Sequence, residues 1–317
     1  MKSLKDTGHD MAYRAAFGAC YAVSSLPLAV HYMFSLLLSL LLCYVVRYRR
    51  RLVKRNIAAS FPTLSRRRRW LIERRFYLYF CDLTVEALKY FSISRKSMRK
   101  RMVFKGVELV EDSCRRGRSC GVFLGHYGNW EWVSSLPLWI DPSVGRCVQL
   151  YHPLENRLLD RLMSHVRERM GATNVSVNES VRHLVRLRAE GTPLVIGFIA
   201  DQAPFWNNIH YWTTFLNHPD TPLFTGPERL MRKFGMDVYY LDVRRTRRGH
   251  YTAEFRLLTR EPDSCGEFEI TEMYTRALEE PIRRQPPYWL WSHNRWKRTR
   301  AEWERIIDPV TGKMVLD

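Results

Sequence analysis

The second half of the chain alternates short apolar runs with longer segments in which apolar residues recur at helical spacing. An apolar run of this length predicts a buried strand, and the longer segments predict helices, several of them closed by glycine. The runs that predict strands are 119–124, 144–151 and 194–200. The segments that predict helices are 130–140, 157–170, 178–190 and 228–234.

Two further apolar segments, 238–243 and 251–258, flank Arg248-Gly249 and predict a hairpin. Strands that alternate with helices are typical of an α/β fold. The pattern therefore predicts a mostly parallel central sheet flanked by helices.

The N-terminal part of the chain has a different pattern. Residues 15–46 contain no Asp, Glu, Lys or Arg, and the stretch is interrupted by Pro27 and His31. Because a bilayer span needs about 20 apolar residues, the stretch predicts either one tilted membrane helix at 22–46 or a helical hairpin that enters one leaflet. A cleaved signal peptide fits less well, since the apolar region is too long and no small-residue cleavage site follows it.

A strongly basic segment follows the apolar stretch. Residues 47–75 hold twelve basic side chains and one acid, Glu73. Basic residues that flank a hydrophobic segment stay on the cytoplasmic side and attract anionic head groups. We expect residues 1–55 to be a membrane anchor with a basic flank and residues 56–317 to be the main domain at the cytoplasmic face. A solvated charge run or a nucleic-acid patch is the alternative explanation.

The overall composition fits a folded protein with an anionic partner. The net charge is +19, and apolar residues make up 46% of the chain. Such a charge suits nucleic acid, an anionic bilayer, an acidic protein or a phosphorylated substrate. The seven cysteines include no CxxC pair, which argues against a zinc cluster and favours reduced thiols.

The candidate chemistry lies in the segment Gly125-His126-Tyr127-Gly128-Asn129-Trp130-Glu131. On one helix, His126 and Glu131 would lie about 140° apart, but with His126 in a loop before the helix the two side chains can meet. A carboxylate on one imidazole nitrogen fixes the tautomer and raises the basicity of the other. We therefore expect His126 to be a general base oriented by Glu131, with backbone N–H groups at the helix start available for an oxyanion.

This segment resembles the His-x4-Asp/Glu block of the lysophospholipid acyltransferase superfamily, and in particular the lauroyl and myristoyl transferases of late lipid A biosynthesis. Further blocks match in the family's order over roughly residues 20–300. These blocks are Arg55-Asn56 with Phe61-Pro62, Tyr151-His152-Pro153 with Asn156 and Leu159-Asp160, Ala200-Asp201-Gln202, Phe215-Leu216 with Thr225-Gly226 and Arg229, and Trp289 to Lys297.

The resemblance implies a glycerol-phosphate-acyltransferase-like fold in the cell inner membrane, with the catalytic domain on the cytoplasmic side. It implies an acyl carrier protein thioester as donor and a hydroxyl of an anionic glycolipid, a lipid A precursor, as acceptor. Direct transfer needs no metal and no organic cofactor. The acidic carrier protein, the glycolipid and the membrane surface are then the anionic partners, and nucleic acid is not one.

The resemblance also nominates residues that bind substrate, although turn, capping or solvated roles remain open for Asp201, Gln202 and the arginines. The residues are Asn129, His152, Asn156, Asp201, Gln202, Arg229 and Arg295. His152 departs from the family, in which an arginine stands at this position. A neutral histidine binds phosphate less well, so the same chemistry on another acceptor, such as a lysophospholipid, an amino-acid lipid or a pigment lipid, is an alternative. A basic membrane-anchored binding protein is the alternative outside enzymes.

Overall fold

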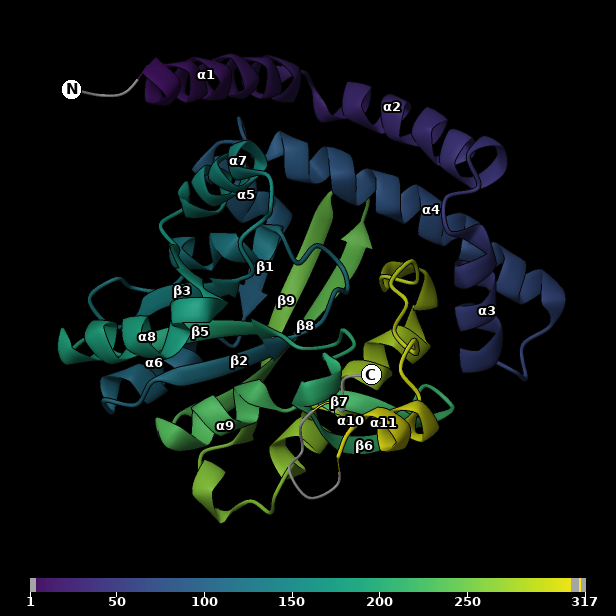
Figure 1. Ribbon diagram of the computed structural model, residues 1–317. Helices are drawn as coiled ribbons and strands as arrows, with labels where there is room; N and C mark the ends of the chain where they lie inside the picture. Colours follow the sequence, from purple (N-terminus) through teal and green to yellow (C-terminus); the bar gives the residue numbers. More distant parts are fainter. Residues whose placement is uncertain (1–3, 309–313, 315–317) are drawn as a thin grey trace.

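The computed structural model describes residues 4–308 and residue 314. Its centre is a seven-stranded sheet with the order β1-β9-β8-β2-β5-β3-β4, crossed by helices on both faces (Figure 1). Neighbouring strands run parallel except β8 and β9, which form an antiparallel hairpin. The strands are β1 (Met102–Lys105), β2 (Cys120–Leu124), β3 (Arg146–Tyr151), β4 (Thr173–Ser176), β5 (Leu194–Ile199), β8 (Asp237–Arg247) and β9 (His250–Thr259). The predicted mostly parallel α/β sheet is confirmed.

The remaining elements surround this sheet. A separate antiparallel hairpin consists of β6 (Ile209–Phe215) and β7 (His218–Phe224). The N-terminal helices are α1 (Leu4–Ser25), α2 (Leu28–Leu40), α3 (Arg50–Ser60) and α4 (Arg66–Lys89). The other helices are α5 (Arg95–Arg101), α6 (Val107–Arg115), α7 (Arg157–Glu168), α8 (Ser180–Ala189), α9 (Gly226–Lys233), α10 (Glu269–Arg284) and α11 (Arg300–Ile306).

The hydrophobic core lies on both faces of the sheet. Successive side chains of a strand point to opposite faces, so Phe123 of β2 packs with α10 on one face while Val122 and Leu124 pack on the other. Because both faces are covered, β2 is buried along its whole length. This explains why its sequence is apolar throughout rather than alternating.

Most predicted elements are confirmed, but the helix predicted at 130–140 is wrong. The chain there forms a 3-10 helix over Trp132–Leu138 that contains Pro137. Proline has no N–H to donate and clashes with the preceding turn, which disfavours a regular α-helix. The hairpin β6–β7 was not predicted; it turns at Leu216 and Asn217, both with positive φ.

The apolar N-terminal stretch is divided at Pro27 into α1 and α2, so the predicted helix beginning at residue 22 begins at Leu28 instead. One helix of the described chain is long and apolar enough to cross a membrane, Leu28–Val45, with a mean hydropathy of 2.0. It lies alongside α4 (Figure 1), and its polar face is fastened there by Ser35, whose hydroxyl donates to Asp82 (2.5 Å). The opposite face exposes apolar side chains such as Leu37.

The boundary expected between residues 55 and 56 falls inside α3. Val53 and Ile57, on either side of that boundary, are both buried in the core that α3 shares with α4. The N-terminal helices therefore pack directly on the rest of the chain.

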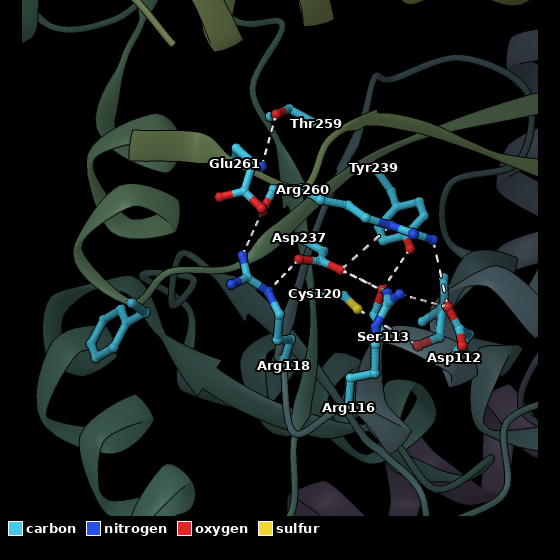
Figure 2. Close-up of polar contacts among 12 residues, drawn as sticks. Asp112, Ser113, Arg116, Arg118, Cys120, Asp237, Tyr239, Thr259, Arg260 and Glu261 are labelled. Carbon is cyan, nitrogen blue, oxygen red and sulfur yellow. Dashed lines mark hydrogen bonds and ion pairs between the residues drawn. The ribbon is translucent and has the colours of Figure 1, made fainter. Parts of the chain in front are cut away.

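The amino ends of the central strands are held by a buried ionic cluster (Figure 2). Asp237, at the start of β8, pairs with Cys120 at the start of β2 in the strand register. The fully buried Asp237 carboxylate accepts hydrogen bonds from Arg118 (2.5 Å) and Ser113 (2.6 Å). Each oxygen of the Asp237 carboxylate therefore has a donor. The cluster holds β2 and β8 together at their amino ends, away from their carboxyl ends.

Candidate functional site

His126 and Asp201 meet at the carboxyl ends of two adjacent parallel strands. In the register of β2 and β5, Leu124 pairs with Ile199, and each polar residue follows two positions later. The Nδ1 atom of His126 lies 2.6 Å from Oδ1 of Asp201. The backbone N–H of His126 donates to Oδ2 of the same carboxylate at 2.9 Å. Asp201 therefore fixes both the ring and the backbone of His126.

The Asp201 carboxylate is enclosed and fully hydrogen-bonded. Its side chain is 2% exposed, and the indole Nε1 of Trp289 donates to Oδ2 at 2.8 Å. Burial alone would raise the pKa of Asp201, but the adjacent His126 and the hydrogen bonds from His126 and Trp289 outweigh it and hold the pKa at about 2. Asp201 is therefore ionised at neutral pH and stabilises positive charge on the imidazole.

The other ring nitrogen of His126 faces outward. The His126 side chain is 18% exposed, and its Nε2 lies 3.2 Å from the side-chain nitrogen of the exposed Gln202. With Nδ1–H donating to Asp201, Nε2 keeps its lone pair and accepts from the Gln202 amide. The ring of Trp130 packs against the imidazole at a centroid distance of 5.1 Å. The arrangement presents an imidazole whose Nε2 faces the exposed Gln202, on the side open to an incoming group.

Two glycines let the loop pass close to its neighbours. A Cβ atom at Gly125 would lie 2.6 Å from Cδ1 of Leu278 and 3.2 Å from Oδ2 of Asp201. Gly128 has a φ of +64°, and a Cβ atom there would lie 2.8 Å from the carbonyl oxygen of Val243. A larger residue at Gly128 would displace the loop that carries His126, because the obstacle is backbone and φ is positive, whereas at Gly125 it would press on the buried Leu278 side chain.

The expected contact between His126 and Glu131 is not formed, and this prediction is corrected. Asp201 occupies Nδ1 of His126, while the Glu131 carboxylate accepts two hydrogen bonds from Arg167 of α7, at 3.1 and 3.2 Å. Glu131 lies in the turn just before the 3-10 helix, and that turn directs its side chain toward α7. Glu131 thus connects the loop to α7 and does not orient His126.

Asn129, expected to bind substrate, is instead fully buried. Its side-chain oxygen accepts from the N–H of Trp132 (3.0 Å), and its amide nitrogen donates to Glu86 of α4 (2.7 Å). Glu86 also accepts from Tyr32 of α2 and Tyr251 of β9. Asn129 therefore caps the turn after His126 and fastens the loop to the N-terminal helices.

Two more nominated residues also have structural tasks. The side-chain oxygen of Asn156 accepts from the N–H groups of Leu158 (3.0 Å) and Leu159 (3.1 Å), which makes it the N-cap of α7. Arg295 is 1% exposed and donates to the carbonyl oxygen of Pro222 (2.6 Å). Burial lowers its pKa to about 10. Its guanidinium is shielded from solvent, and its Nε and Nη1 atoms have no hydrogen-bond partner among the described residues.

The last two nominated residues are exposed. His152 lies in the loop after β3, and Arg229 lies on α9. Among the residues that the structure describes, neither makes a hydrogen bond or an ion pair with His126 or Asp201. Of the seven residues nominated for substrate binding, the structure brings only Asp201 and Gln202 to His126.

Sequence reasoning missed Trp289 and Arg167 as parts of this site. Trp289 forms a β-bridge with Tyr127, and the next residue, Leu290, donates its N–H to the carbonyl oxygen of His126 at 3.1 Å. Asn56 of α3 in turn donates to the carbonyl oxygen of Trp291 at 3.0 Å. Segments from opposite ends of the chain are thus joined behind the loop that carries His126.

The described residues contain no group of three or more His, Cys, Asp or Glu side chains that could hold a metal ion. The site itself presents a histidine that is held by a buried carboxylate.

The family described as bacterial lipid A biosynthesis acyltransferase matches residues 10–298 of the chain. No curated protein matches it significantly. The matched region includes His126, Asp201 and the segment around Trp289.

Proposed function

The chain belongs to the bacterial lipid A biosynthesis acyltransferase family, and from this membership we infer that it moves a fatty acyl chain from an acyl carrier protein thioester to a hydroxyl of a lipid A precursor. The acyltransferase activity follows from the family. The donor, the acceptor hydroxyl and the catalytic residues are our proposal.

His126 is the general base in this proposal. Its Nε2 takes the proton of the acceptor hydroxyl as that oxygen attacks the thioester carbonyl, and the tetrahedral intermediate then collapses with loss of the thiolate. The imidazolium returns the proton to the thiolate, so the products are an ester and a free thiol. The buried Asp201 carboxylate, 2.6 Å from Nδ1, stabilises the imidazolium throughout. This hydrogen bond is the observation that carries the proposal.

Gln202 and Glu131 have supporting roles. The Gln202 amide lies at Nε2 of His126 and is exposed, so an acceptor hydroxyl can displace it and take its place. Glu131, through its ion pair with Arg167, holds the loop against α7. A misplacement of the base by about 1 Å can cost about 100-fold in rate, so this ion pair supports catalysis without touching the reacting atoms.

We propose that the enzyme works at the cytoplasmic face of the inner membrane. The apolar helix Leu28–Val45 and the family both indicate membrane anchoring. The basic residues of α3 and the start of α4 follow that helix directly, which favours the cytoplasmic side. An acidic carrier protein would be steered toward such a positive surface.

Mass spectrometry of lipids from cells that lack the protein tests the acceptor. We expect lipid A to lose one acyl chain and to regain it when the wild-type gene, but not the His126→Ala gene, is restored. An unchanged lipid A would refute lipid A as acceptor. His152, which stands where the family has an arginine, favours a second candidate: the same transfer onto another lipid, which would then be the species that disappears.

A further inference from the structure

We propose that a groove along α4 binds a phosphate-bearing membrane lipid, with its headgroup among four arginines and its acyl chain against the apolar N-terminal helix. The groove consists of two adjoining pockets. The headgroup pocket, of about 380 Å³, is bounded by Arg68 and Arg75 of α4 and by Arg283 and Arg284 at the end of α10. Binding at this groove does not require acyl transfer and can be measured separately from it.

The headgroup pocket has an excess of positive charge. Among the described residues, Arg68 and Arg75 form no ion pair. Arg284 is paired with Asp242 at 3.2 Å. Arg283 makes a longer ion pair, of 3.5 Å, with Glu279 on the same helix. Guanidinium groups bind phosphate oxygens with paired hydrogen bonds, and several together favour a doubly charged phosphate ester.

The acyl pocket, of about 310 Å³, adjoins the first across α4. It shares Leu71 and Arg75 with the headgroup pocket and continues to Leu36 and Leu40 of α2. Leu36 and Leu40 belong to the helix that is apolar enough to cross a membrane, and both are exposed. A lipid can therefore keep its chain beside this helix while its phosphate reaches the arginines on the other side of Leu71.

The groove also adjoins the catalytic loop. Tyr288, which forms one wall of the headgroup pocket, accepts a hydrogen bond from the N–H of Gly128 at 3.0 Å. The hydroxyl of Tyr79, on α4, donates to the carbonyl oxygen of Gly128 at 2.5 Å. A lipid held here by its phosphate would therefore lie next to the segment that carries His126.

The test measures lipid binding to the full-length protein in neutral detergent by calorimetry. The probes are dihexanoyl phosphatidic acid, the uncharged diacylglycerol with the same chains, and inorganic phosphate. The variant Arg68→Gln/Arg75→Gln removes two exposed charges from α4, and the control Arg182→Gln/Arg186→Gln removes two exposed charges from α8. Thermal melting of each variant checks that the fold is intact.

We expect the α4 pair to weaken phosphatidic acid binding at least tenfold and the α8 pair to change it less than twofold. The diacylglycerol should bind weakly to every form. Leu71→Gln should weaken phosphatidic acid binding while leaving the binding of inorganic phosphate unchanged. Equal losses in both arginine pairs, or inorganic phosphate binding as tightly as the lipid, would overturn the proposal.

Two further measurements identify the occupant. If a lipid A precursor competes with phosphatidic acid, the groove takes the phosphate of the acceptor; if both bind together, it holds a resident phospholipid of the membrane. Either result supports a phosphate-bearing lipid. If the α4 pair weakens the binding of acyl carrier protein and leaves phosphatidic acid binding unchanged, the surface docks a protein and the proposal is wrong.

Discussion

Replacing Asp201 by asparagine keeps the shape of the side chain and removes its charge. The Asp201 carboxylate accepts three hydrogen bonds, from the N–H of His126 (2.9 Å), from Nδ1 of His126 (2.6 Å) and from Nε1 of Trp289 (2.8 Å). An amide has one oxygen, and its NH2 group must face at least one of these donors. We therefore expect Asp201→Asn to leave His126 in the wrong tautomer or the wrong position.

The magnitude of this effect follows from the same contacts. In serine hydrolases, the equivalent change of an orienting carboxylate lowers kcat by about 10⁴-fold. Because the thiolate in the proposed reaction leaves before it is protonated, we expect a loss of about 10³- to 10⁴-fold here. The pKa of Asp201 is about 2 in the fold and about 3.9 in an unfolded chain, a difference equivalent to about 2–3 kcal/mol of stability. Because the folded pKa is the lower one, this stability is present above about pH 4 and is lost as the pH falls through about 2. Asp201→Asn should remove it at neutral pH.

The assay is transfer of a labelled acyl chain from acyl carrier protein to the lipid acceptor, run beside urea denaturation. The matched control is Glu131→Gln, which changes the other carboxylate near His126 in the same way. We expect kcat to fall about tenfold in the control, because Glu131 acts only through its contact with Arg167. If Glu131→Gln abolished transfer while Asp201→Asn retained it, the assignment of Asp201 as the partner of His126 would be refuted.

Three other changes test separate parts of the account. Gly125→Ala should abolish transfer and lower the unfolding free energy by about 1–3 kcal/mol, because the added methyl group would lie 2.6 Å from Leu278. Urea denaturation measures this loss, and a variant of normal stability would contradict the prediction. Burial and neighbouring positive charge lower the pKa values of His218 and His293 to about 4, below the value of about 6.5 in an unfolded chain. Stability should therefore be intact above about pH 6.5 and decline toward pH 4, and thermal melting of His218→Gln should show a smaller decline than wild type. Arg167→Gln should lower kcat about tenfold with little change in stability, since it frees the loop from α7; an unchanged kcat would remove that role.

Five strands of the sheet could be predicted because each depends on local patterning, whereas β1 and β4, of four residues each, were too short to stand out. The apolar lengths of β2, β3 and β5 matched buried strands, and the hairpin of β8 and β9 was predicted from the turn at Arg248-Gly249. The segment after His126 could not be predicted as a 3-10 helix from its apolar spacing. Pro137 was the local evidence against a regular α-helix, because proline has no backbone N–H and clashes with the preceding turn. The spacing of apolar residues does not show this effect.

The catalytic histidine could be predicted from its motif, but its partner could not. Asp201 lies 75 residues from His126 and reaches it only because β2 and β5 are neighbours in register. One signal was present in the sequence: both residues come within two positions of the end of a predicted buried strand. Adjacent parallel strands bring such residues together, whereas the spacing of His126 and Glu131 along the chain says little about where a turn directs the second side chain.

The central claim is that His126 is the base for acyl transfer. The most direct measurement is a single-turnover reaction of the purified protein with labelled acyl carrier protein and a lipid A precursor, with the product weighed by mass spectrometry. We predict that the wild-type protein adds one ester-linked acyl chain to the precursor and that His126→Ala, folded and membrane-bound, adds none. Transfer by His126→Ala at the wild-type rate would contradict the account.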